Sequence, residues 1–259
     1  MHCVKTHYPR SREEAVVRCR EWLSKGAVFV DTETTGLNKD DEIIENCIVD
    51  AYGAILLDSL VKPTKPIPPE ATMINGITNK DVMRAPKWPT LYDKVRIILE
   101  GRLVIAYNSA FDRRMVCQTN EKYGLAQINA TWQCAMITYA GFRGVPTSKK
   151  NRFKHFKLGV AAQQMGIGIE TELHRSKADC LLTLELVKAM AKAEAKKLAA
   201  GGEDWTTWVA STSKDDVSHR KPTRDAFNRK TQRKKPAGCG GVAATLFVLV
   251  LLVMVAFIV

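Results

Sequence analysis

The sequence lacks the marks of several common classes of protein. Its seven cysteines are scattered and form no C-x-x-C pair, which excludes a zinc ribbon and argues against a disulfide framework. We expect most of them to be small core residues in a reducing compartment. The sequence contains no internal repeat, and its first residues, "MHCVKTHYPRSREE", have no apolar run of the kind found in secretory signal peptides.

Acidic residues are the scarcer of the charged ones. The chain of 259 residues has 27 Asp and Glu against 39 Lys and Arg, so its formal net charge is +12. Such a surplus indicates an anionic partner, either nucleic acid or a membrane surface, although a merely basic, solvated surface would produce the same balance. The hydrophobic fraction of 46% is that of a globular protein that buries a core.

Charge is absent altogether from residues 242–259, "VAATLFVLVLLVMVAFIV". As a helix they would span about 27 Å, close to the roughly 30 Å of a bilayer core, so we expect a single-pass transmembrane tail anchor. Residues 203–241 are predicted to be a basic, flexible linker. The cluster "RKTQRKK" at residues 229–235 favours a membrane-anchored protein whose catalytic domain lies on the cytoplasmic side.

The pattern of the remaining residues predicts an α/β fold. Ser11 and Glu14 form a capping box for a helix that ends at Gly26, and residues 1–26 are interpreted as an N-terminal helical extension of a domain at residues 27–202. Strands are expected at "AVFVDT" and "RLVIAYN", and a pair of them in "EIIENCIVDAYGAILLDSLVKP". Helices are expected at "TLYDKVRIILEG", at "SAFDRRMVCQTNEKYG" and over residues 174–201, and "TWQCAMITYAGF" is ambiguous with helix favoured.

Two acids, Asp31 and Glu33, stand at the end of the first apolar strand. Residues i and i+2 of a strand point to the same side, so the two carboxylates project together. In a partly buried place they repel each other, and one of them takes up a proton unless a divalent cation is bound. Alone, this pair is weak evidence for a metal site, because strand ends often carry acids.

Two further acids add to the pair. Asp112 follows a predicted strand near the start of a helix, and Asp179 lies in the last predicted helix, five residues after His174. On that helix Asp179 shares a face with an apolar stripe, Leu182, Leu186 and Met190. A carboxylate in line with such a stripe needs a partner, and a metal ion is the natural one; a fully solvated Asp179 is the alternative.

The four carboxylates and the histidine lie in three motifs, "VDTETTGL", "YNSAFD" and "HRSKAD". In this order the motifs resemble the DEDDh subtype of the DEDD superfamily, the proofreading-type 3′–5′ exonucleases, over roughly residues 27–198. One departure is Tyr107, where many relatives have histidine, which bears on substrate preference but removes no metal ligand. The tyrosine subtype is disfavoured, because Arg175 stands where its tyrosine would be.

The resemblance implies a ribonuclease H-like fold with a mixed five-stranded sheet, and two Mg²⁺ or Mn²⁺ ions about 4 Å apart at the scissile phosphate. It implies that Asp31 bridges both ions, that Glu33 and Asp179 hold the first, and that Asp112 supports the second. His174 would be the general base, a role that suits a side chain titrating near neutral pH. The residues implied in substrate binding are Thr34 beside the terminal sugar, Leu37 as a wedge at the terminal base, and Asn108 near the terminal nucleotide's backbone.

The implied function is hydrolysis of nucleic acid from a free 3′ end to nucleoside 5′-monophosphates, with DNA favoured and the enzyme tethered to a lipid bilayer. An RNA-trimming exoribonuclease and a non-catalytic nucleic-acid or membrane tether are the alternatives. The basic, phenylalanine-containing stretch at residues 142–157 either tracks a phosphate backbone or is a solvated loop anchored by Phe153 and Phe156. The sequence leaves open a homodimer and any polymerase partner.

Overall fold

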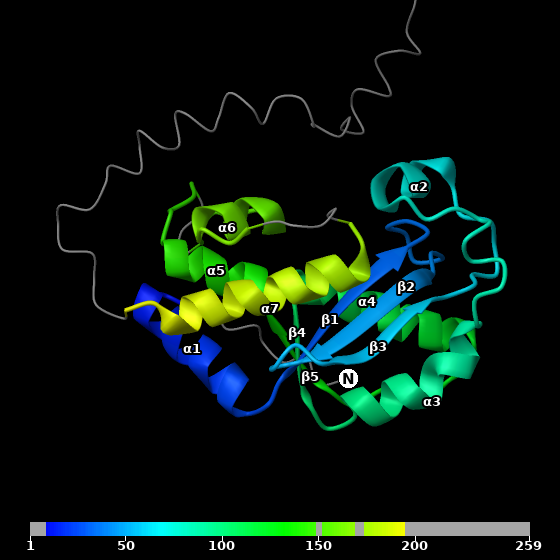
Figure 1. Ribbon diagram of the computed structural model, residues 1–259, viewed down its shortest axis with the longest axis horizontal. Helices are drawn as coiled ribbons and strands as arrows, with labels where there is room; N and C mark the ends of the chain where they lie inside the picture. The colour runs from blue at the N-terminus through cyan, green and yellow to red at the C-terminus, as the bar shows by residue number, and fades with distance from the viewer. Residues whose placement is uncertain (1–8, 149–151, 169–173, 195–259) are drawn as a thin grey trace, which may run out of the picture. The chain divides into compact units, whose positions relative to one another are not determined.

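A five-stranded mixed sheet forms the centre of the protein (Figure 1). The computed structural model describes residues 9–148, 152–168 and 174–194. The strands are β1 (Val28–Thr34), β2 (Ile43–Asp50), β3 (Ile55–Leu60), β4 (Leu103–Ala106) and β5 (Thr131–Cys134), and their order in the sheet is β3-β2-β1-β4-β5. β1 pairs antiparallel with β2 and parallel with β4, so the strand that carries the paired acids lies in the middle. The predicted mixed α/β sheet is confirmed.

Helices cover both faces of the sheet (Figure 1). They are α1 (Arg12–Ser24), α2 (Pro69–Asn75), α3 (Trp88–Leu99), α4 (Ser109–Lys122), α5 (Ala135–Arg143), α6 (Leu158–Gln164) and α7 (Ser176–Lys192). Phe29 of β1 belongs to a core shared with α1, α5, α6 and α7, whereas its neighbours Val28 and Val30 belong to a second core shared with α3 and α4. Both faces of β1 are therefore buried, which explains its nearly continuous apolar run.

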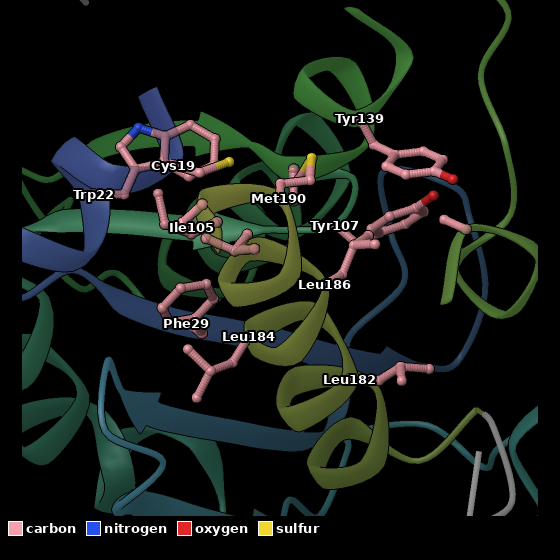
Figure 2. Packing of buried hydrophobic residues seen from close by; sticks show 14 of the residues in the cluster. Cys19, Trp22, Phe29, Ile105, Tyr107, Tyr139, Leu182, Leu184, Leu186 and Met190 are labelled. Carbon is pink, nitrogen blue, oxygen red and sulfur yellow. The ribbon is translucent and has the colours of Figure 1, made fainter. Parts of the chain in front are cut away.

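The core beneath α7 joins elements that are far apart in sequence. Figure 2 shows Leu184 of α7 beside Phe29 of β1, and Met190, nearer the other end of α7, close to Cys19 of α1. The apolar stripe predicted for the last helix is thus confirmed as buried. Four of the five cysteines in the described part of the chain are also buried, as expected for small core residues.

α1 is part of this core. Its side chains Ala15, Val16, Cys19 and Trp22 are buried against α5 and α7. The Ser11 half of the predicted capping box is present, because the Ser11 hydroxyl accepts from the Glu14 N–H at 3.2 Å. The Glu14 carboxylate accepts from the N–H of Arg10, one residue before the N-cap, at 2.8 Å. The helix that the sequence suggests as an extension is built into the same hydrophobic cluster as β1 and α7.

Several predicted boundaries differ from the structure. The segment for which helix was favoured, "TWQCAMITYAGF", divides into β5 and α5, because Thr131–Cys134 pair in parallel with β4. α7 begins at Ser176, after His174, and ends at Lys192 rather than near residue 201. Its last carbonyls are bound from α1, where Arg20 donates to Ala191 O at 2.8 Å. The short helices α2 and α6 were not predicted.

The predicted linker at residues 203–241 and the predicted tail anchor at residues 242–259 both lie outside the described residues. Within the described ranges, none of the helices combines the length and the hydropathy that a bilayer-spanning segment requires.

Replacing Trp22 by alanine tests how far the core depends on α1. Trp22→Ala should lower the free energy of unfolding by about 3–5 kcal/mol, the usual loss for a large buried aromatic side chain. The matched control is Val17→Ala on the same helix, where the side chain is 58% exposed and a change within about 0.5 kcal/mol is expected. Urea unfolding followed by circular dichroism measures both, and equal effects of the two substitutions would contradict the integration of α1.

Candidate active site

Three carboxylates meet at the end of the central strand. Asp31 and Glu33 are two residues apart in β1 and leave the same face of the sheet, the face on which α7 lies against β1. Asp179, in the first turn of α7, completes the group. Each of the three offers a ligand oxygen, and these oxygens lie within 4.8 Å of one another. The shared projection predicted for Asp31 and Glu33 is confirmed, and the helix brings the third acid to them.

Asp112 reaches the same strand from the opposite face. It lies in the first turn of α4 and is buried. Its Oδ1 accepts from the Thr32 N–H at 3.1 Å and from the Thr32 hydroxyl at 2.9 Å. Because Thr32 stands between Asp31 and Glu33, this contact fixes α4 to the strand at the site. The group of three close carboxylates does not include Asp112, which acts on them through its charge.

The pKa values of these acids are displaced upward. Burial, followed by the charges of Asp112, Asp179 and Glu33, raises the pKa of Asp31 well above its usual range. Burial and then the charge of Asp179 raise the pKa of Glu33 to about 8, although a hydrogen bond from Asn75 acts to lower this pKa. Burial also raises the pKa of Asp112 to about 7, although its bonds to Thr32 oppose the shift. Four acids crowded in this way do not all ionise unless positive charge is supplied.

The residues present fit divalent cations. Oδ1 of Asp179 is buried and has no hydrogen-bond partner among the described residues, so it is an acceptor that the protein itself leaves unsatisfied. Carboxylate oxygens are the ligands that Mg²⁺ and Mn²⁺ prefer. A bound cation would satisfy this oxygen and offset the repulsion that raises the pKa values. Asp31, Glu33 and Asp179 would hold such ions, with Asp112 beside them.

His174 lies next to this cluster in an unusual backbone conformation. Its φ is +69°, the only positive value for a residue other than glycine in the described ranges, and such conformations cost on the order of 1–3 kcal/mol. The His174 N–H donates to Asp179 Oδ2 at 3.3 Å. This bond and the nearby imidazole lower the pKa of Asp179, whereas burial raises it more strongly. The conformation therefore keeps an exposed histidine beside the acids.

The predicted substrate-binding residues have different environments. Thr34 is buried, and its hydroxyl donates to Gly36 O at 2.8 Å. Leu37 is 63% exposed and its carbonyl accepts from the Arg114 guanidinium at 3.2 Å. Asn108 is exposed at the N-cap of α4, and its side chain makes no capping bond. Leu37 and Asn108 can thus meet a ligand, and Thr34 shapes the turn between Glu33 and Leu37.

Asn75 is a site residue that the sequence interpretation missed. It ends α2, is buried, and its side-chain amide donates to Thr34 O at 3.5 Å and bonds to Glu33. The signal for its helix is present in the sequence. Pro69 at the first helical position and Gly76 in the left-handed conformation just after the helix are the usual start and stop of a short helix.

Tyr107, the departure within the second motif, ties a basic loop to the core. Its hydroxyl donates to Phe156 O at 2.7 Å, and the Phe156 ring packs edge-to-face on Tyr139 with centroids 5.7 Å apart. Phe156 is thus an anchor of the loop, one of the two roles that the sequence allowed. Lys154 of the same loop is exposed and lies over that ring, which leaves positive charge on its outer side.

A mixed sheet that gathers acids at the end of its central strand, beside a histidine, defines a metal-dependent phosphodiester hydrolase. The comparisons narrow the class. A family model described as "Exonuclease" matches residues 28–187, and the chain belongs to this family. The three motifs that resemble the DEDDh 3′–5′ exonucleases all lie within the matched residues. The uncharacterized exonuclease CP81 of Escherichia phage 186 is 43% identical over 181 residues, which cover 68% of this chain and 93% of that protein.

Other relatives are more distant. Exodeoxyribonuclease 10 of Escherichia coli strain K12 is 32% identical over 163 residues, which cover 61% of this chain and 66% of that protein. DNA polymerase III subunit epsilon of Treponema pallidum is 28% identical over 172 residues, covering 64% and 77%. Among solved structures, the nuclease domain of 3′hExo, a DEDDh family member bound to rAMP, aligns with a TM-score of 0.53 at 18% identity, over 63% of this chain and 90% of that chain. That likeness shows the fold.

The raised pKa values predict how stability depends on pH and metal. Without metal, the folded state binds more protons than the unfolded state between about pH 4, where free carboxyls titrate, and about pH 8, the folded value for Glu33. The stability contributed by these protonated acids is present below that window and is lost as the pH rises through it. In EDTA the melting temperature should therefore fall between pH 5 and pH 8, and Mg²⁺ should restore it at pH 8.

Asp31→Asn provides the matching variant for this pH dependence. It should raise the melting temperature at pH 8 in EDTA by a few degrees, since about 1 kcal/mol corresponds to roughly 2–4 °C in a domain of this size, and should remove most of the Mg²⁺ effect. The control is Asp93→Asn on α3, an acid with a 79% exposed side chain. If the melting temperature of the wild type changed with neither pH nor Mg²⁺, the inferred repulsion among the carboxylates would be refuted.

Proposed function

We propose that the chain is a divalent-metal-dependent 3′–5′ exonuclease that hydrolyses DNA to nucleoside 5′-monophosphates at a membrane surface. The observation that supports the chemistry is the cluster of Asp31, Glu33 and Asp179, with its raised pKa values and its unsatisfied Asp179 oxygen. Two Mg²⁺ or Mn²⁺ ions would supply charge that offsets the scissile phosphate and would lower the pKa of bound water. The membrane part rests on residues 242–259.

The protein's own groups divide the remaining work. His174 is the general base, whose imidazole accepts a proton from the attacking water. The backbone N–H of His174 orients the Asp179 carboxylate. Asn75 supports Glu33 from α2. Leu37, largely exposed next to the site, is an apolar side chain against which the terminal base stacks. Hydrolysis from the 3′ end leaves the phosphate on the released nucleotide, so the product is a nucleoside 5′-monophosphate.

The relatives favour DNA over RNA. Exodeoxyribonuclease 10 is 32% identical to this chain, whereas RNA exonuclease 4 of Cryptococcus neoformans is 20% identical. An RNA-trimming activity is the second candidate, and a comparison of matched DNA and RNA oligonucleotides separates the two.

The tether is a separate part of the proposal. Residues 242–259 have the length and composition of a single-pass helix, and the basic residues before them favour a cytoplasmic catalytic domain. If residues 203–241 behave as a flexible coil, its mean span is on the order of 30–35 Å. The enzyme would then work near the bilayer without being pressed against it.

Substitution of the site residues tests the chemistry. Asp31→Ala or Asp179→Ala should abolish turnover of the full-length protein while the fold survives, because removal of an acid relieves repulsion. His174→Ala should slow turnover by about 10²–10⁴-fold, the usual contribution of a general base. Asp93→Ala is the control that should change nothing. The assay uses 5′-labelled DNA and RNA strands with Mg²⁺ or EDTA, and progressive shortening from the 3′ end is expected. Full activity in EDTA would refute the dependence on metal. Release of labelled mononucleotide from the first time point would refute the 3′–5′ direction.

Deletion of residues 242–259 tests the tether. The truncated protein should appear in the soluble fraction, with undiminished activity on short oligonucleotides, because every site residue lies within residues 31–179. Carbonate extraction of membranes is the measurement. Full-length protein that is released at high pH does not span a bilayer, and residues 242–259 would then serve as a buried or partner-binding segment.

A further inference from the structure

A fifth carboxylate, Glu45, lies next to the cluster without belonging to it. Glu45 is on β2 directly opposite Glu33 in the antiparallel register, and its side chain is only 4% exposed. A charge buried so deeply requires compensation by partners. Among the described residues, the hydrogen-bond donors to its carboxylate all come from one place, the start of α7.

Those partners form a tight junction. The Arg175 guanidinium donates to Glu45 Oε1 through both Nε at 3.1 Å and one terminal nitrogen at 2.5 Å. The Ser176 backbone N–H donates to Oε2 at 2.8 Å, and the Ser176 hydroxyl donates to Glu45 O at 3.3 Å. α7 has no side-chain cap of its own at Arg175. The carboxylate from β2 takes that place and also meets the positive end of the helix dipole.

This junction borders two groups of the site, His174 just before α7 and Asp179 in its first turn. Arg175 follows His174 directly, and Asp179 lies one turn into the helix, where its N–H bonds to Arg175 O at 3.0 Å. His174 holds a left-handed backbone that a free chain would avoid. Such a conformation persists only where its surroundings determine it, and the bonds from Arg175 and Ser176 to the sheet are the ones adjacent to it.

We propose that the Arg175–Glu45 pair is a positioning pair that holds His174 at the metal cluster. In this role the arginine acts on the reaction by fixing the start of α7 against β2. A misplacement of about 1 Å in a reacting group lowers turnover by about 10²-fold, so the pair should matter for kcat and not for substrate affinity. The proposal rests on the role of His174 as the base.

The test compares Arg175→Ala with two matched changes in the full-length protein. Arg175→Ala should lower kcat by about 10²-fold with KM for a short oligonucleotide unchanged. Lys177→Ala is the control, since it removes the same charge two residues later, where Lys177 pairs with Asp58 at 3.4 Å and has an equally exposed side chain of 48%. It should retain wild-type kcat. Glu45→Gln should repeat the loss seen with Arg175→Ala.

A double variant separates positioning from a general loss of structure. If Arg175 acts through His174, then Arg175→Ala should lower kcat by no more than about twofold in a His174→Ala background. A loss of folded protein would instead multiply the two effects. Methylguanidinium added to Arg175→Ala should recover activity, because the guanidinium site is half exposed, whereas Arg175→Lys, which cannot bond through two nitrogens, should stay impaired.

The outcomes distinguish this proposal from the proposed function. Slow turnover in His174→Ala together with normal turnover in Arg175→Ala overturns the positioning role alone. Normal turnover in His174→Ala overturns both. A raised KM in Arg175→Ala means that the arginine binds substrate, and multiplied losses in the double variant mean a structural role; either result rejects the positioning pair.

Discussion

Mutual repulsion among acids at the end of β1 is the constraint on which the rest of the structure depends. Burial and neighbouring charges raise the pKa of Asp31 and of Glu33. A protein that needed only stability would not keep such a group. The surrounding elements hold the carboxylates in place against this repulsion, so that a divalent cation finds its ligands already assembled and releases the strain when it binds.

The contacts that hold the carboxylates in place lie on both faces of the sheet. On one face, Thr32 bonds to Asp112 and joins α4 to the strand. On the other, α7 presents Asp179 while Glu45 of β2 binds the start of that helix. Alternation of side chains along β1 makes this possible, because Thr32 points away from Asp31 and Glu33. The four acids thus come from three elements, β1, α4 and α7.

Local periodicity was enough to predict much of the site. The spacing of Asp31 and Glu33 predicted their shared direction, and the stripe after Asp179 predicted a helix that faces the core. Predictions that depended on partners were less accurate. "TWQC" forms a strand because β4 lies beside it, and α7 stops at Lys192, next to Ala191, whose carbonyl accepts from Arg20 of α1.

The sequence by itself determined which chemistry the chain carries, since three motifs with their acids and histidine are local patterns. It also determined the central strand, whose apolar run requires burial on both faces. Only the tertiary structure decided that Asn75 supports Glu33, that Tyr107 anchors the basic loop, and that Glu45 binds the start of α7. These contacts join residues that are 42, 49 and 131 positions apart in the sequence. No local pattern encodes them, because they arise only when separate elements pack on one sheet.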